Sequence, residues 1–251
     1  MPANDPKKFV AQLELSPVED GMKQSLPGSG LQDVEENQEE GYVNNKSLVS
    51  FVSSVSGQNR KDVLNSTLLA QRAADKKYPD PADVLNWYEM YIDVLTQIGW
   101  VVEEKNFANF DSSNTLLEME NVVIDILVTM VGQNYVAVIK STLDAVKGLA
   151  DDDGRIKVFE SNTHNFQKGN FQIGLVNETN GAVSMNLGAF MLESQDEIKR
   201  ILFFKGGKDK SALSYYAIRC TLNDDIYSLV RNDILAKLGP ATQSFIGKLD
   251  I

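Results

Sequence analysis

The acidic run DDDG at residues 151–154 is the stretch whose residue types and spacing come nearest to a metal site. When the run is aligned on its glycine, Asp151, Asp153 and Glu160 fall at positions three, five and twelve of an EF-hand loop, where carboxylates bind Ca²⁺. Position one would be Leu149, which has no ligating atom. The alternative is an acidic turn whose glycine adopts a positive φ, and the pattern favours that turn over calcium binding.

A nucleophilic site is the second chemistry to consider, and its ingredients are one cysteine, Cys220, and one histidine, His164. Cys220 lies at an alternating apolar position, which favours a small core residue; a Cys220–His164 pair is the alternative. If the thiol faced a cavity, it would be a candidate for acylation or redox modification, although only Arg219 among its neighbours would lower its pKa. A single cysteine forms no intrachain disulfide, so the sequence does not imply an oxidising compartment.

Other catalytic and cofactor-binding patterns are missing from the sequence. The segment Gly206-Gly207-Lys208 lacks the spacing of a phosphate-binding loop, and there is no G-x-G-x-x-G, paired-cysteine zinc pattern or G-x-S-x-G. We therefore predict a protein that is not an enzyme and that uses no cofactor.

The amino-acid composition limits the classes of partner that this protein could bind. The 251 residues carry a net charge of −11, and 43% of them are hydrophobic, which is enough for a substantial core. Nonspecific binding to nucleic acid or to an anionic membrane requires a basic surface, so this acidity argues against both. No apolar run of signal-peptide length follows Lys7 and Lys8. We expect a cytoplasmic protein, or one released by a route that uses no classical signal peptide.

The most apolar long segment, residues 115–149, is the element around which we expect the fold to be organised. Apolar residues recur in steps of three and four on both sides of Gly132, which predicts two helices joined by a tight turn, a buried helical hairpin. Val122, Val128 and Val131 widen the first apolar face and predict burial on more than one side. Membrane insertion is the alternative. However, a spanning helix needs about 20 mostly apolar residues, and charged residues interrupt both helices: Glu118, Glu120, Asp125, Lys140, Asp144 and Lys147.

Ahead of the hairpin we predict an arm followed by helices. Residues 1–41 should form a flexible acidic arm, because they combine scattered prolines, a Pro-Gly-Ser-Gly stretch and an acidic run at residues 33–40. Residues 42–150 should form a helical region. Its predicted elements before the hairpin are a short helix at 48–55 ended by Gly57, a helix at 62–77 capped by Asp62, a helix at 82–98, and a brief extended piece at 100–102.

After the hairpin the apolar period changes from helical to alternating, which predicts an antiparallel β-sheet within residues 151–251. Asn180-Gly181 is a strong hairpin turn signal, since both residues tolerate a positive φ. A last helix should begin at Asn223 or Asp224 and end at Gly239. The predicted strands lie at 155–159, 171–176, 183–189, 199–205 and 215–222, with one docking turn at 245–249.

The predicted fold class is therefore α+β, with an N-terminal helical region that contains a buried helical hairpin, followed by an antiparallel β-sheet and a C-terminal helix. Residues 42–251 are expected to share one core. These features favour a non-enzymatic interaction or self-assembling protein, whose partner is another protein or a second copy of the chain. The alternative is a membrane-active or lipid-binding effector, toxin-like in character, that brings the apolar hairpin to membrane lipid. Nucleic acid is not an expected partner.

Overall fold

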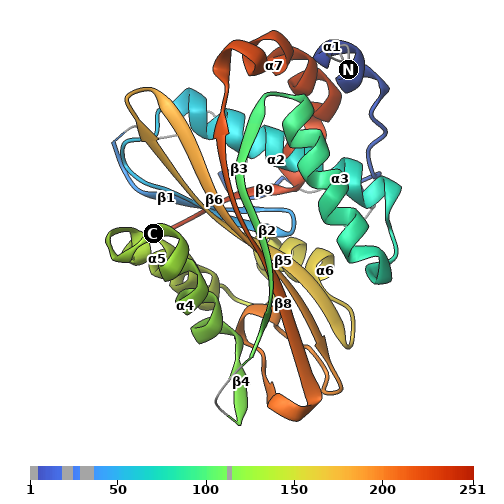
Figure 1. The fold of residues 1–251 in the computed structure, drawn as a ribbon, viewed down its shortest axis with the longest axis vertical. Coiled ribbons are helices and arrows are strands. Elements are labelled where there is room, and N and C mark those ends of the chain that lie inside the picture. Colours follow the sequence, from blue (N-terminus) through green and yellow to red (C-terminus); the bar gives the residue numbers. More distant parts are fainter. Residues whose placement is uncertain (1–4, 19–24, 29–36, 112–114) are drawn as a thin grey trace.

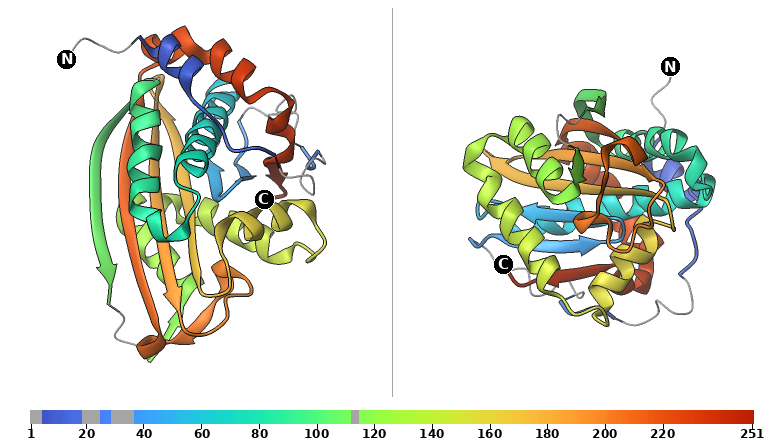
Figure 2. Two further views of the ribbon diagram at one scale, coloured as in Figure 1. Left: turned by 90° about the vertical axis from the view of Figure 1, so that its right-hand side faces the viewer. Right: turned by 90° about the horizontal axis from the view of Figure 1, so that it is seen from below.

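The computed structural model describes residues 5–18, 25–28, 37–111 and 115–251. Within these residues, seven strands form one sheet with helices on both faces, so the fold has three layers (Figures 1 and 2). The strand order is β3-β8-β6-β5-β2-β1-β9. The strands of this sheet are β1 (Glu40–Asn44), β2 (Ser47–Phe51), β3 (Trp100–Phe110), β5 (Lys168–Thr179), β6 (Ala182–Ser194), β8 (Ser211–Leu222) and β9 (Ile246–Leu249).

Neighbouring strands in the sheet are antiparallel, except that β2 and β5 are parallel. Two short strands, β4 (Leu116–Glu118) and β7 (Lys205–Gly207), pair with each other in a separate ribbon. Strands β1, β2 and β3 precede the helical hairpin in the chain and pair with strands that follow it. The sheet is therefore built from both halves of the sequence.

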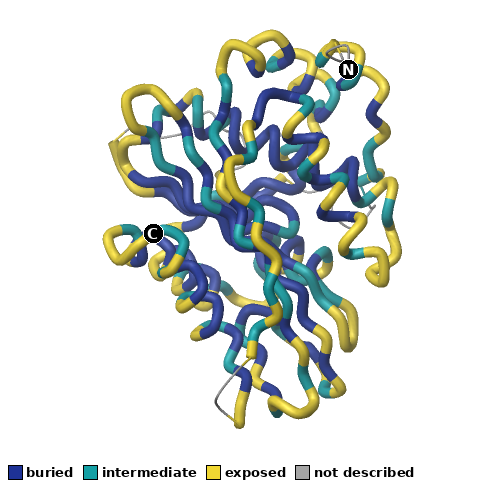
Figure 3. Tube along the Cα trace, in the orientation of Figure 1, coloured by how far each residue is buried: buried dark blue, intermediate teal, exposed yellow. Residues whose placement is uncertain are grey.

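One face of the sheet is covered by α2 (Gly57–Lys77), α3 (Val84–Gln97) and α7 (Asp224–Leu238), and α1 (Pro6–Gln12) packs against α7. The helix α2 is buried along most of its length, and every residue from Asp62 to Ala74 is shielded from solvent (Figure 3). A short 3₁₀ turn at Pro81–Asp83 joins α2 to α3.

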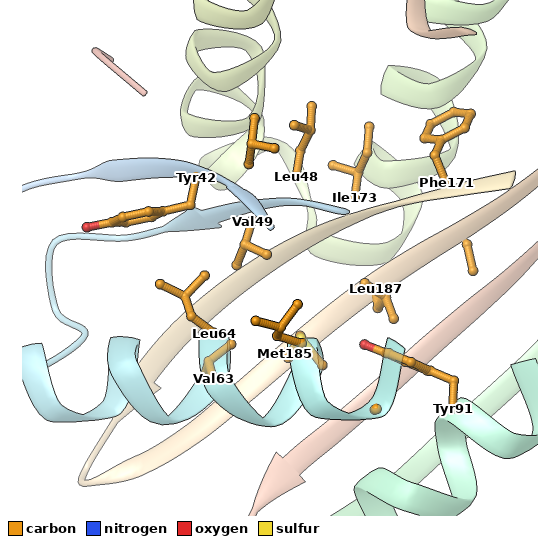
Figure 4. Packing of buried hydrophobic residues seen from close by; sticks show 14 of the residues in the cluster. Tyr42, Leu48, Val49, Val63, Leu64, Tyr91, Phe171, Ile173, Met185 and Leu187 are labelled. Carbon is orange, nitrogen blue, oxygen red and sulfur yellow. The ribbon is translucent and has the colours of Figure 1, made fainter. Parts of the chain in front are cut away.

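The opposite face carries α4 (Met119–Val131), α5 (Val136–Gly148) and α6 (Gly154–Thr163). Side chains alternate between the two faces along each strand. Val49 and Met185 therefore face α2, whereas Leu48, Ile173 and Phe171 point to the other side (Figure 4). Helices cover both faces of the sheet, and the strands β1 and β2 are buried at every residue.

The α+β class and the largely antiparallel sheet are confirmed. The predicted helical hairpin corresponds to α4 and α5, with the chain turning at Gly132 (φ 77°). The β5–β6 hairpin turns where the sequence predicts, at Asn180 and Gly181, which have φ angles of 53° and 79°. The last helix also follows the prediction, because the Asn223 side chain accepts a hydrogen bond from the Ile226 N–H at the start of α7.

The helix predicted at 48–55 is wrong, because this segment contains β2. Leu48 and Val49 are both buried, one against each helical layer, so the apolar residues do not alternate and their spacing imitates that of a helix. Gly57 begins α2 instead of ending a helix. Its N-cap is Ser56, whose side chain accepts a hydrogen bond from the Asn59 N–H, and Asp62 is an interior position of the helix.

Four other predicted elements also need correction. Residues 155–159 belong to the helix α6, in which Ile156, Phe159 and Thr163 are buried at helical spacing. Residues 199–205 contain a 3₁₀ turn at Ile201–Phe203 in place of a long strand. The docking turn at 245–249 contains β9, which pairs with β1. The brief extended piece at 100–102 continues as β3 to Phe110, because β8 supplies hydrogen-bonding partners along its whole length.

Burial of α4 on more than one side is not found. Its buried residues are Met119, Val122, Val123, Ile126 and Leu127, which form one face, while Val128 and Val131 are only partly buried. The arm predicted at 1–41 contains α1, and Val10, Leu13 and Leu26 within it are buried. Part of the acidic run, residues 33–36, lies outside the described residues, as do residues 29 and 30 of the Pro-Gly-Ser-Gly stretch and residues 112–114 before the hairpin.

Candidate functional site

Strand β3 lies at one edge of the sheet, and no strand of the described residues pairs with its outer side (Figure 2). It is 11 residues long, roughly twice the length of a typical strand. The outward N–H and C=O groups of an edge strand are free to pair with another strand. This edge is therefore a candidate surface for strand addition.

The two halves of β3 differ in how well they are protected from such pairing. The register with β8 shifts between Val102 and Glu104, which marks a bulge, and three consecutive charged residues, Glu103 to Lys105, follow at the same place. Bulges and charges both discourage edge pairing. The remaining stretch, Asn106–Phe110, carries no charge, and its Phe107 side chain is 48% exposed. We call Asn106–Phe110 the open half of β3.

A groove of about 360 Å³ runs beside the open half on the face that carries α4. Its floor includes Asn106 and Ala108 of β3 and Ala217 of β8, and Met130 of α4 lies along its wall. The Arg219 guanidinium spans the groove, because it donates hydrogen bonds to the Asn186 Oδ1 (3.2 Å) and to the Met130 carbonyl (3.4 Å). The groove thus combines a flat, small-residue floor with a polar rim.

The second candidate surface is the interface between the helical hairpin and the sheet. The hairpin buries an apolar face there, and few polar contacts attach it. The Ser50 and Thr142 hydroxyls share a hydrogen bond of 2.8 Å, and the Met119 N–H donates to the Phe204 carbonyl at 3.0 Å. The buried side chains on α5 are Val136, Val138, Ile139, Thr142, Leu143 and Val146. Packing against the sheet, and not hydrogen bonding, therefore holds most of the hairpin in place.

The outward face of the hairpin is polar and charged. Glu120 pairs with Lys147 across the two helices at 2.9 Å, and Asp125 and Lys140 are exposed. Within the ranges that the structure describes, no helix is long and apolar enough to cross a membrane.

A polar cleft of about 440 Å³ lies where α2 and α3 meet the end of α6 and the start of β5. Lys46 and Asp75 form an ion pair of 2.6 Å inside it. The Trp87 indole N–H donates to Asp75 at 2.8 Å, and the Lys46 ammonium lies 5.0 Å from the centre of the Trp87 ring. The Lys46 and Asp75 charges neutralise each other, so the cleft holds a structural ion pair at its centre.

The structure does not gather the carboxylates that were considered as calcium ligands. Asp151 is exposed, while Asp153 caps α6 and pairs with Arg155 at 2.8 Å. Glu160 accepts a hydrogen bond from the Ile201 N–H and lies 2.9 Å from the His164 Nε2. Among the residues with described positions, no three His, Cys, Asp or Glu side chains could hold a metal ion together. Gly154 does not adopt a positive φ, because it is the first residue of α6.

His164 and Cys220 lie in separate environments. Burial lowers the pKa of His164, but its hydrogen bonds to Glu160 and the Asn165 carbonyl and the charge of Glu160 outweigh that effect and raise the pKa above its ordinary value. Cys220 is 1% exposed, and its thiol donates to the Met185 carbonyl at 3.7 Å. Burial, with the nearby charge of Glu103, raises the pKa of Cys220 well above its ordinary value. The thiol is therefore protonated and enclosed, which favours a core role.

The polar side chains of α2 form a buried network that periodicity alone does not reveal. Arg60, fully buried, pairs with Glu40 at 2.5 Å, and Lys248 reaches the other oxygen of Glu40 at 2.8 Å. Asp62 is buried and accepts three hydrogen bonds from Arg231 of α7. Burial raises the pKa of Asp62 in spite of these bonds. The sequence signal of this network is weak: charged and amide residues are interspersed with apolar ones over residues 57–72, as they are in many exposed helices.

No known protein family matches the sequence, and no curated protein matches it either. Several solved structures are weakly similar, and three of them serve as examples. One is described as a delta-endotoxin, with 12% identity, a TM-score of 0.38, and coverage of 72% of this chain and 84% of that one. Another is the activated Cyt2Ba monomer from Bacillus thuringiensis subsp. israelensis, with 11% identity, a TM-score of 0.32, and coverage of 53% and 77%. The third is the Evf virulence factor, with 10% identity, a TM-score of 0.39, and coverage of 94% and 89%.

Proposed function

We propose that this chain is a non-enzymatic self-assembling protein whose sheet is extended by a second copy at the β3 edge. The observation that carries the proposal is the open half of β3, an uncharged stretch of a long edge strand with an exposed phenylalanine. Addition of an antiparallel strand would continue the antiparallel arrangement of β3 with β8. Main-chain hydrogen bonds would supply affinity, and the side chains of the open half would supply specificity.

The net charge opposes this association only at long range. Two copies carry −11 each, but the Debye length is about 8 Å at physiological ionic strength. Charges distant from β3 are therefore largely screened. The three consecutive charges at Glu103 to Lys105 lie at the protected end of the strand and leave the open half neutral.

The test is the molar mass in solution of a double variant of the edge. Asn106→Lys with Asn109→Lys places two positive charges on each copy of the open half, where both side chains are exposed. Light scattering after size-exclusion should show a dimer for the natural protein and a monomer for this variant, with an unchanged circular dichroism spectrum. Lysine side chains on an edge strand discourage the addition of a further strand, because their charges would have to be desolvated in the new pairing.

The matched control adds the same charge elsewhere. Gln133→Lys with Ser141→Lys changes two exposed positions of the hairpin, and this variant should dimerise like the natural protein. A natural protein that is monomeric over a wide concentration range would contradict the proposal, and so would an edge variant that dimerises as well as the control.

A second candidate function is membrane activity through the helical hairpin, and the scarcity of polar attachments beneath α4 and α5 favours it. Release of the hairpin would expose the parts of β6, β2 and β1 that α4 and α5 cover, together with the apolar face of the hairpin itself. Such a surface has the chemistry to enter the interface of a lipid bilayer. Because the protein is acidic, zwitterionic vesicles are the appropriate target.

A disulfide that pins the hairpin to the sheet tests this second function. The Ser50 and Thr142 oxygens are 2.8 Å apart, so Ser50→Cys with Thr142→Cys places two sulfurs within bonding reach. We expect the oxidised variant to release no dye from phosphatidylcholine vesicles at neutral or acidic pH, and the reduced variant to release it. The control is Ser194→Cys with Ser211→Cys, whose oxygens are 3.1 Å apart within the sheet. Equal release by the oxidised and reduced hairpin variants, or none from either, would argue against this function.

A further inference from the structure

We infer that the two β3 strands pair in a single register, with Ala108 facing Ala108 of the second copy. This inference rests on the proposed function and names the geometry of the same surface. Two identical strands that pair antiparallel are related by a two-fold axis perpendicular to the sheet. Residues that face each other then project to the same side, so one residue must face its own copy at the axis.

The charges of β3 discriminate among these registers. With Lys105 at the axis, two ammonium groups of like charge face each other. With Asn106 or Phe107 at the axis, Lys105 faces a neutral residue, Phe107 or Asn109. With Ala108 at the axis, Lys105 faces Asp111 at both ends of the pairing. Opposite charges directly across a strand pair stabilise it and like charges destabilise it, so the Ala108 register is favoured.

The side chains at both ends already hold ion pairs within the chain, which would have to exchange for these contacts. Lys105, 25% exposed, pairs with Glu89, whose side chain is 61% exposed, and Asp111, 91% exposed, pairs with Lys208 at 2.9 Å. Ion pairs this exposed contribute little and rearrange readily. The Lys105 ammonium also lies 5.2 Å from the centre of the Tyr216 ring on β8, so the lysine side chain must turn outward to reach the second copy.

The same register also places the phenylalanine side chains opposite uncharged residues. Phe107 faces Asn109 on the side of α3, where its ring already lies 5.0 Å from that of Tyr216. On the other side, Phe110 of the second copy faces Asn106, which with Ala108 forms the floor of the groove beside α4. The small side chain at the axis lets the two copies approach closely. A register centred on Phe107 would instead place Glu104 opposite Phe110.

Cysteine cross-linking measures the register directly, because a disulfide requires Cα atoms within about 4.4–6.8 Å. Under mild oxidation of the full-length protein, Ala108→Cys should form a covalent dimer in most molecules. Phe107→Cys and Asn109→Cys alone should form little, but a mixture of these two variants should form a covalent heterodimer. The natural protein is the control, since its buried Cys220 should give no cross-link.

A charge exchange gives a second, reversible readout. Lys105→Asp should raise the dimer dissociation constant at least about fivefold, because two like-charged pairs replace two attractive ones. Asp111→Lys should do the same, and the double variant should return to near the natural value. Light scattering separates the possible failures. A dimer whose cross-link forms through Phe107→Cys, or whose double variant is not restored, overturns the register alone, whereas a monomeric natural protein overturns the self-assembly as well.

Discussion

Replacing Glu40 with leucine should destabilise the protein by about 3–5 kcal/mol, the cost of breaking a buried ion pair from one side. Glu40 is 2% exposed, and its partner Arg60 is fully buried in α2. Glu40→Leu leaves the Arg60 guanidinium with only carbonyl acceptors, those of Gln38, Val52 and Val55. Carbonyl groups do not neutralise the charge, so its desolvation is uncompensated. Urea unfolding followed by circular dichroism measures the change.

Two further variants distinguish the effect of the buried charge on stability from the effect of lost packing. The double variant Glu40→Leu with Arg60→Met should recover much of the lost stability, because it removes both charges and keeps apolar volume. Glu120→Gln breaks an exposed ion pair with Lys147 and should cost less than about 1 kcal/mol. If Glu40→Leu cost no more than Glu120→Gln, the buried network of α2 would not have the energetic role assigned to it.

Leu127→Asp should prevent stable folding or cost more than about 4 kcal/mol, which is exceptional for one substitution. Leu127 is 1% exposed on the buried face of α4. A Cβ atom added at Gly188 would approach it to 3.1 Å, so the leucine sits directly on the sheet. The substitution loses about 1.5–3 kcal/mol of transfer free energy. It also buries a carboxyl group that has no hydrogen-bonding partner in place. Thermal unfolding and the yield of folded protein provide the measurement.

The adjacent residue provides the matched comparison. Val128 is only partly buried, since it points away from the sheet on the same helix. Val128→Asp should therefore give a folded protein, with a loss of about 1 kcal/mol, which is ordinary for a surface or boundary position. Loss of folding in both variants would show that the hairpin is buried on two sides, as its sequence suggested.

Signals that reside in a few neighbouring residues allowed several elements to be predicted. The alternation in β5, β6 and β8 is visible because large apolar residues lie mainly on one face of each strand and small or polar residues on the other. Asn180-Gly181 supplies the positive φ angles of the turn between β5 and β6. The hairpin α4–α5 shows a helical period because only one face of each helix is buried. Asn223 and Gly239 mark the ends of α7 through local caps: the Asn223 side chain accepts a hydrogen bond from the Ile226 N–H, and Gly239 adopts a positive φ.

The central position of α2 and the role of β3 were decided by contacts between residues far apart in the chain. The polar composition of α2 is typical of an exposed helix. Its charged residues are buried because they form ion pairs with residues that are not their neighbours in the chain: Arg60 with Glu40, and Asp62 with Arg231. Apolar and polar residues do not alternate in β2, because helices cover both of its faces and Leu48 and Val49 are both buried. The β3 edge arises because β8 pairs with one side of β3 from Trp100 to Phe110, while no strand of the described residues pairs with the other side. Local sequence encodes backbone conformation, whereas which strand lies at an edge depends on the order of the whole sheet.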